Sequence, residues 1–102
     1  MSRRTPEGKV KDKVKAVLRR FGLYVHMPVL NGYGEPSLDF INCGGGYFIA
    51  VETKAPGKQP TPRQQVTIAE MKKAGGFVFV VSNDDELARM EQTLVLLLLF
   101  PK

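Results

Sequence analysis

The sequence predicts one small α/β domain, residues 1–102, in which a mixed sheet is flanked by helices. Three observations support this fold class. Three segments carry apolar residues at helical spacing, and four shorter apolar segments between them are typical of strands. The segments follow one another in the order helix, strand, strand, strand, helix, strand, helix. Hydrophobic residues make up 43% of the chain, which is enough for a packed core.

The first helix is expected at residues 6–21, and a strand follows it at 23–30. Thr5 is a suitable N-cap for the helix, and Gly22 is expected to end it. Pro28 indicates that the strand lies at an edge of the sheet or is broken. The apolar stripe of the helix consists of Val10, Val14, Val17, Leu18 and Phe21.

The next two strands, at 38–43 and 47–53, are separated by glycines, which predicts an antiparallel hairpin. Residues two apart in a strand share a face, so Glu52 and Lys54 are expected to point the same way. An even-length loop would place Asp39 on this face, opposite Glu52 or one diagonal away. An odd-length loop would place Asp39 on the other face, and the sequence allows both.

The second half of the chain is predicted to supply a helix, a strand and a last helix. The first of these helices begins at Pro62 with Thr61 as its N-cap, after a proline-rich loop. The strand at 77–82 is apolar nearly throughout, which is typical of the centre of a sheet. The last helix begins after Asn83 or Asp84. Its apolar face is expected to contain Leu87, Met90, Leu94 and Leu97 or Leu98.

The charge and the rare residue types narrow the classes of function. The formal net charge is +5 and the sequence pI is near 9.6, which favours an anionic partner, most commonly nucleic acid. The single cysteine, Cys43, excludes an intrachain disulfide. We expect it to be buried, in a protein of a reducing, intracellular compartment. The single histidine, His26, excludes sites that need several imidazole ligands, and we expect it to be an ordinary strand residue.

The last helix is apolar on all sides in its final segment, LVLLLLF at 94–100. This run is too short to span a bilayer, which needs about 20 residues. The basic start of the chain is not followed by the apolar run of a signal peptide. A small domain cannot easily cover every side of such a helix. We therefore expect a homodimer, with this helix or a sheet edge at the interface, and no membrane association.

Asp39, Glu52 and Lys54 form the candidate site. Two carboxylates this close on a partly buried face repel each other unless a positive charge lies between them. Hard oxygen ligands select Mg²⁺ or Mn²⁺, and Lys54 can then orient a water or stabilise charge that grows on a phosphate. Glu7 projects from the stripe of the first helix as a further acid, or alternatively as a partner of the helix dipole. Gln64 is a polar residue on the inward face of the second helix.

These residues also carry a resemblance to a known family. Asp39 and the tripeptide ETK at 52–54 resemble the core motif of the PD-(D/E)XK nuclease superfamily. The continuation KAPGKQPTPRQ, the helix after it and AGGFVFVV are similar to the VRR-NUC family, whose small phage members are stand-alone nuclease domains. The similarity covers roughly residues 5–82. It implies a restriction-endonuclease-like αβββαβ core followed by a C-terminal helix.

The activity that the resemblance implies is metal-dependent hydrolysis of DNA phosphodiester bonds inside a cell, such as the bacterial host of a phage. The residues carried over as catalytic are Glu7, Asp39, Glu52, Lys54 and Gln64. Asp39, Glu52 and the backbone carbonyl of Thr53 would bind the metal, Mg²⁺ or Mn²⁺. Lys54 would be the catalytic lysine. The sequence departs from the motif at Leu38, which stands where a proline usually precedes the aspartate.

Basic residues are expected to hold the DNA through phosphate contacts, which are salt-dependent and independent of base sequence. The candidates are Arg3, Arg4, Lys9, Lys13, Lys58, Arg63, Lys72 and Lys73. Branched DNA such as a four-way junction is a candidate substrate, because a two-fold dimer would carry two active sites for paired cuts. Two alternatives stay open: a non-catalytic DNA-binding module with the same fold, and a nuclease subunit that needs a partner.

Overall fold

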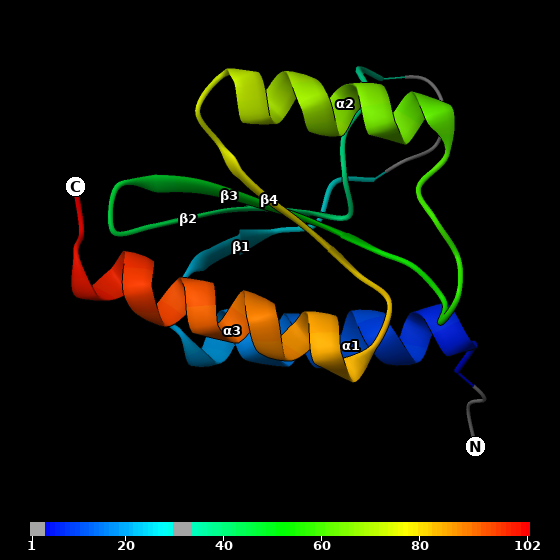
Figure 1. The fold of residues 1–102 in the computed structure, drawn as a ribbon, viewed down its shortest axis with the longest axis horizontal. Helices are drawn as coiled ribbons and strands as arrows, with labels where there is room; N and C mark the ends of the chain where they lie inside the picture. Colours follow the sequence, from blue (N-terminus) through cyan, green and yellow to red (C-terminus); the bar gives the residue numbers. More distant parts are fainter. Residues whose placement is uncertain (1–3, 30–33) are drawn as a thin grey trace.

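The structure is a computed structural model that describes residues 4–29 and 34–102, so the DNA-binding candidate Arg3 lies outside the described residues. The predicted order of helices and strands is confirmed (Figure 1). The elements are α1 (Pro6–Arg20), β1 (Tyr24–His26), β2 (Phe40–Gly44), β3 (Tyr47–Thr53), α2 (Pro62–Lys73), β4 (Phe77–Val81) and α3 (Asp84–Leu99).

The four strands form one mixed sheet in the order β1-β2-β3-β4. β1, β2 and β3 are antiparallel neighbours, whereas β4 returns through α2 and pairs parallel to β3. In Figure 1, α2 covers one face of the sheet, and α1 and α3 lie side by side on the other. The prediction that β4 lies at the centre of the sheet is wrong, since it is an edge strand. Its residues are apolar on both sides because α2 and α3 both pack against it.

Side-chain caps begin all three helices as the sequence predicts. The Thr5 hydroxyl accepts a hydrogen bond from the backbone N–H of Gly8 at 3.0 Å, and Thr61 begins α2 with a capping box. Asn83 begins α3 by accepting from the backbone N–H of Glu86 at 2.8 Å. These caps satisfy N–H groups that have no partner within the helix, which fixes where each helix begins.

The β2–β3 hairpin has a two-residue turn made of Gly45 and Gly46. Their φ angles of 61° and 86° lie in the left-handed region that glycine tolerates and that tight hairpin turns require. The ladder runs from Gly44 opposite Tyr47 to Phe40 opposite Val51. The loop is therefore even in length, and one further step of this register places Asp39 opposite Glu52.

Two apolar cores lie on the two faces of the sheet. Ile49 and Val51 of β3 point to the larger core, against α1 and α3, and Ala50 points to the smaller core, against α2. The larger core also contains Val14, Val17, Leu18, Leu23, Phe40, Val81, Met90 and Leu94. Because side chains alternate along a strand, Glu52 leaves β3 on the α2 face and Thr53 on the α1 face.

Some details of the antiparallel half of the sheet differ from expectation. β1 is shorter than the predicted 23–30 and ends before Pro28, and β2 begins two residues later than predicted, at Phe40. Cys43 is exposed, so the prediction that it is buried is wrong. Its cross-strand partners Tyr24 and Phe48 are exposed as well. Among the described residues, no helix combines the length and apolar character needed to cross a membrane.

Candidate functional site

The hairpin brings Asp39, Glu52 and Lys54 together at the ends of β2 and β3. The Glu52 carboxylate accepts a hydrogen bond through Oε1 from the backbone N–H of Asp39 at 3.2 Å. Its other oxygen, Oε2, lies 3.5 Å from the Lys54 ammonium nitrogen. The backbone N–H of Lys54 in turn donates to the carbonyl of Val81 at 3.0 Å, which ties the base of this side chain to β4. Glu52 therefore contacts both of the other residues, Lys54 through its carboxylate and Asp39 through the Asp39 backbone.

The Asp39 carboxylate turns towards Thr53 and α1. The expectation that an even-length loop places it on the Glu52 face is therefore wrong for this side chain. Oδ2 accepts from both the backbone N–H of Thr53, at 3.0 Å, and its hydroxyl, at 2.6 Å. Oδ1 lies 3.6 Å from the ammonium nitrogen of Lys11 on α1. Asp39 can turn in this way because it lies at a bend just before the first residue of β2. Its side chain is therefore not held to the alternating directions of a regular strand.

Among the described residues, Glu52 has the most strongly shifted pKa. It is only 2% exposed, and burial is the main cause that raises its pKa from 4.5 to about 7. The negative charge of Asp39 raises the pKa further, while Lys54 and the hydrogen bond from Asp39 act in the opposite direction. The positive charge of one lysine therefore does not offset the cost of ionising this buried acid. A second positive charge at this position would stabilise the carboxylate.

Lys11 and the hydroxyl of Thr53 are parts of the site that the sequence patterns did not reveal. Lys11 looks like one of several solvated lysines of α1, and its contact with Asp39 depends on how the helix packs against the sheet. One signal was present, because Lys11 follows Glu7 by four residues and thus lies on the same side of the helix. For Thr53, the resemblance predicts a role of the backbone carbonyl and none of the hydroxyl.

Glu7 and Gln64 are less closely connected to this cluster. Glu7 is half-buried in the first turn of α1, where an acid also interacts favourably with the helix dipole. Gln64 completes the capping box of α2, since its side-chain oxygen accepts from the backbone N–H of Thr61 at 3.0 Å. Each residue thus has a structural role within its own helix, and the catalytic roles suggested by the resemblance stay predictions.

The oxygen donors fit a hard divalent cation that keeps part of its water shell. Within residues 4–29 and 34–102, no three or more His, Cys, Asp or Glu side chains form a metal-binding group, so the donors are the two carboxylates of Asp39 and Glu52. A strand residue directs its N–H and C=O to the same side, which puts the Thr53 carbonyl on the Asp39 side. Mg²⁺ usually binds through one or two carboxylates together with waters and substrate phosphates.

The predicted DNA-binding residues fall into three groups. Arg4 and Lys13 are paired with acids of the same chain, at 3.0 Å from Asp12 and 3.0 Å from Asp84 respectively. Lys9, Lys58 and Arg63 are exposed and have no acidic partner within 4.0 Å among the described residues. Lys72 and Lys73 lie in the last turn of α2, at the opposite end of that helix from Arg63 (Figure 1).

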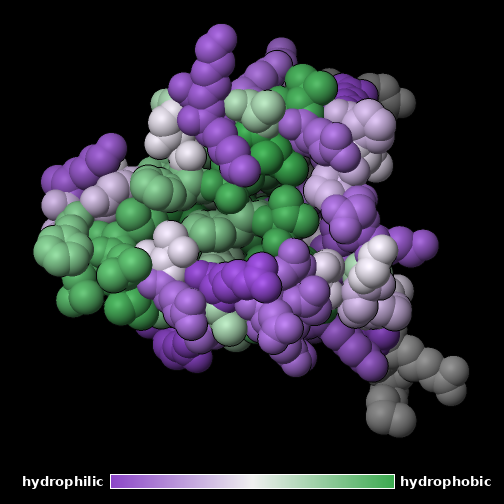
Figure 2. Space-filling model, viewed as in Figure 1, coloured by the Kyte–Doolittle hydropathy of each residue, from purple (hydrophilic) through white to green (hydrophobic). Residues whose placement is uncertain are grey.

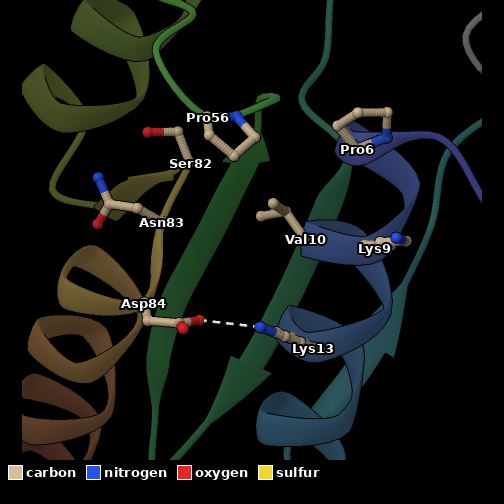
Figure 3. Close-up of a pocket in the computed structure, with 8 residues that line it drawn as sticks. All are labelled: Pro6, Lys9, Val10, Lys13, Pro56, Ser82, Asn83 and Asp84. Carbon is tan, nitrogen blue, oxygen red and sulfur yellow. Dashed lines mark hydrogen bonds and ion pairs between the residues drawn. The ribbon is translucent and has the colours of Figure 1, made fainter.

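A pocket of about 330 Å³ lies beside the site, between the start of α1 and the start of α3 (Figure 3). Lys13 reaches across it to Asp84, and Pro56, two residues after Lys54, forms part of its wall. Its lining residues are Pro6, Lys9, Val10, Lys13, Pro56, Ser82, Asn83 and Asp84. The lining does not include Asp39 or Glu52, so the pocket and the acidic cluster are neighbours and not one cavity.

The fold and the site together define an α/β protein in which a buried acid, a second acid and a lysine lie at one end of the central strands of the sheet, with a second lysine contributed by α1. Comparison of the chain with models of known protein families and with curated proteins found no match.

Proposed function

We propose that this protein is a metal-dependent endonuclease that hydrolyses phosphodiester bonds of DNA. One observation carries the proposal: Glu52, Asp39 and Lys54 meet at the end of a buried strand, with Glu52 buried and its pKa raised to about 7. A buried acid beside a second acid is costly for folding, and such perturbed groups cluster at functional sites. A divalent cation is the ligand that best compensates them.

The order of elements supports the finer assignment to a restriction-endonuclease-like αβββαβ core of the VRR-NUC type. Three antiparallel strands follow the first helix, and a crossover helix leads to a parallel fourth strand. Asp39 and Glu52 lie at the open end of the hairpin, away from its glycine turn. Lys54 follows Glu52 by two residues, as in the motif that the chain resembles. α3 then packs beside α1 as an addition to this core (Figure 1).

In the proposed reaction, Asp39, Glu52 and the Thr53 carbonyl would hold Mg²⁺ or Mn²⁺. The cation would supply Lewis-acid chemistry, polarising a phosphate oxygen and lowering the pKa of a water. Lys54 places a positive charge beside the cluster, where it orients the attacking water or stabilises the negative charge that grows on the phosphate. Thr53 fixes the Asp39 carboxylate through two hydrogen bonds.

DNA binding is proposed to rest on the exposed basic residues Lys9, Lys58 and Arg63, with Arg4 and Lys13 available after exchange of their acidic partners for phosphate. With such contacts, the affinity for DNA falls steeply as the salt concentration rises and does not depend on base sequence. We further propose that the protein is intracellular and acts as a homodimer. Branched DNA such as a four-way junction is its candidate substrate. Two copies of the site related by a two-fold axis could each cut one strand of such a junction, which gives two paired cuts.

The test is cleavage of plasmid, duplex and four-way DNA in Mg²⁺, in Mn²⁺ and in EDTA. Wild-type protein should cut only with a metal, and Lys54→Ala and Asp39→Asn should reduce the rate by at least about a hundredfold, the range typical of removing one electrostatic catalytic group. Asp39→Asn retains an oxygen that can accept from Thr53, so it removes charge with little loss of structure. Arg89→Ala, at an exposed basic residue of α3 outside the proposed DNA-binding set, is the matched control and should cut at the wild-type rate.

Cleavage by both site variants at the wild-type rate would contradict the proposal. A second candidate, a non-catalytic DNA-binding module, is favoured by one observation: only two carboxylates meet in the described part of the chain. Under that function the protein would shift DNA in a gel without cutting it in any metal. Cleavage that appears only when a second protein is added would indicate a nuclease subunit that depends on a partner.

A further inference from the structure

The ion pair between Lys11 and Asp39 is unlike the other ion pairs of α1. The side chains of Lys11 and Asp39 are 31% and 12% exposed, whereas those of Lys13 and Asp84 are 58% and 80% exposed. Charges that are partly removed from water interact more strongly than charges on the open surface. Lys11 therefore contributes to the electrostatics of the site, although it comes from a different element than the acids.

The two oxygens of Asp39 have different partners. Oδ2 is bound to Thr53 by two hydrogen bonds, at 3.0 and 2.6 Å, and is therefore firmly held. Oδ1 faces Lys11 at 3.6 Å, which is a charge contact but too long for a hydrogen bond. Oδ1 is thus the oxygen to which another cation can bind without breaking a hydrogen bond. To do so, the cation must displace Lys11.

We propose that Lys11 is a positioning residue that neutralises Asp39 in the metal-free protein and competes with the divalent cation for Asp39 Oδ1. This inference rests on the proposed function, since it concerns the same cluster. Two positive groups at one carboxylate oxygen repel each other, so Lys11 lowers the affinity for metal. An incoming DNA phosphate offers Lys11 another anion, which relieves the repulsion. Lys11 thereby couples metal binding to DNA binding, so that each raises the affinity for the other.

The experiment measures Mn²⁺ binding to the purified protein by titration calorimetry, without DNA and with a short duplex in Ca²⁺-free buffer at low temperature. Lys11→Gln should bind Mn²⁺ about tenfold more tightly than wild type without DNA, within the usual range of coupling between sites. Lys11→Arg retains the charge and should bind like wild type. Arg19→Gln is the matched control, because Arg19 is an exposed basic residue about two turns further along the same helix, and it should also bind like wild type.

Added duplex should raise the Mn²⁺ affinity of wild type several-fold and that of Lys11→Gln much less. Lys11→Met, which retains the aliphatic stem of lysine, is the second neutral variant, and thermal unfolding identifies any variant that has lost its fold. If wild type binds Mn²⁺ and the folded neutral variants bind it equally or more weakly, the role of Lys11 is wrong while the nuclease proposal stands. If no folded variant binds Mn²⁺, both proposals fail.

Discussion

At the scale of single residues, Glu52 is where folding and the proposed function conflict. The pKa of its carboxyl is raised from 4.5 to about 7, chiefly by burial. In the unfolded chain the same carboxyl has its ordinary pKa near 4.5, so between these two values the folded protein binds a proton that the unfolded chain does not. The contribution of Glu52 to the free energy of unfolding is therefore most favourable below pH 4.5. It is lost as the pH rises towards 7.

We predict that Glu52→Gln raises the free energy of unfolding of the metal-free protein at pH 8 by about 1 to 3 kcal/mol. This is less than the full linkage value because the substitution also removes the acidic partner of Lys54, whose side chain is only 14% exposed. At pH 5 the same substitution should change it little. Urea unfolding in EDTA at both pH values measures the effect. Glu70→Gln, at an exposed acid of α2, serves as the control. An equal effect of Glu52→Gln at both pH values would contradict the assigned pKa.

The residue scale also separates what the sequence reveals from what it does not. The glycines between the two strands predict a hairpin with Asp39 near Glu52, but the length of the loop, and with it the face that Asp39 occupies, cannot be read from the sequence. Lys11 and the Thr53 hydroxyl could not be predicted, because their contacts depend on the packing of α1 and on a bend at Asp39. Such contacts join residues far apart in the chain and leave no periodic pattern.

At the scale of elements, the turn of the β2–β3 hairpin sets the geometry of the site. Gly46 has a φ of 86°, and a Cβ at this position would lie 2.9 Å from the Cβ of Lys102. We predict that Gly46→Ala lowers the free energy of unfolding by about 1 to 2 kcal/mol, the cost of a left-handed conformation for a residue with a Cβ. Urea unfolding measures the change. Gly34→Ala, where a Cβ meets no atom of the described residues within 4 Å and no positive φ is recorded, should be nearly neutral.

The elements that the sequence predicts best are those with local signals. The three N-caps, the two-residue turn and the order of helices and strands follow from neighbouring residues. The position of β4 in the sheet was predicted wrongly, because an apolar strand can be central or can be an edge strand covered by helices on both faces. Strand order is a property of the whole chain, so composition alone could not decide between these cases.

At the scale of the whole molecule, hydrophobic residues remain exposed along one side. Figure 2 shows them gathered between α2 and α3, where β4 lies, and at the end of α3. Leu96, Leu99 and Phe100 are 59%, 66% and 71% exposed. The outer edge of β4 has no strand partner within the described residues. Uncovered edge strands and apolar patches are typical of interfaces in solution. The exposed side therefore supports the proposed homodimer.

We predict that the protein is a dimer at micromolar concentration and that Leu99→Glu shifts it towards monomer by at least tenfold in dissociation constant, because a charge buried at an interface without a partner costs more than about 1.4 kcal/mol. Size-exclusion chromatography with light scattering measures the mass. Val66→Glu, at a 58% exposed position on α2, is the matched control and should leave the dimer intact.

A wild-type monomer at this concentration would contradict the proposed homodimer. A dimer unaffected by Leu99→Glu would exclude the end of α3 from the interface. The exposed edge of β4 would then be the expected interface, because two copies of that strand can pair around a two-fold axis without involving α3.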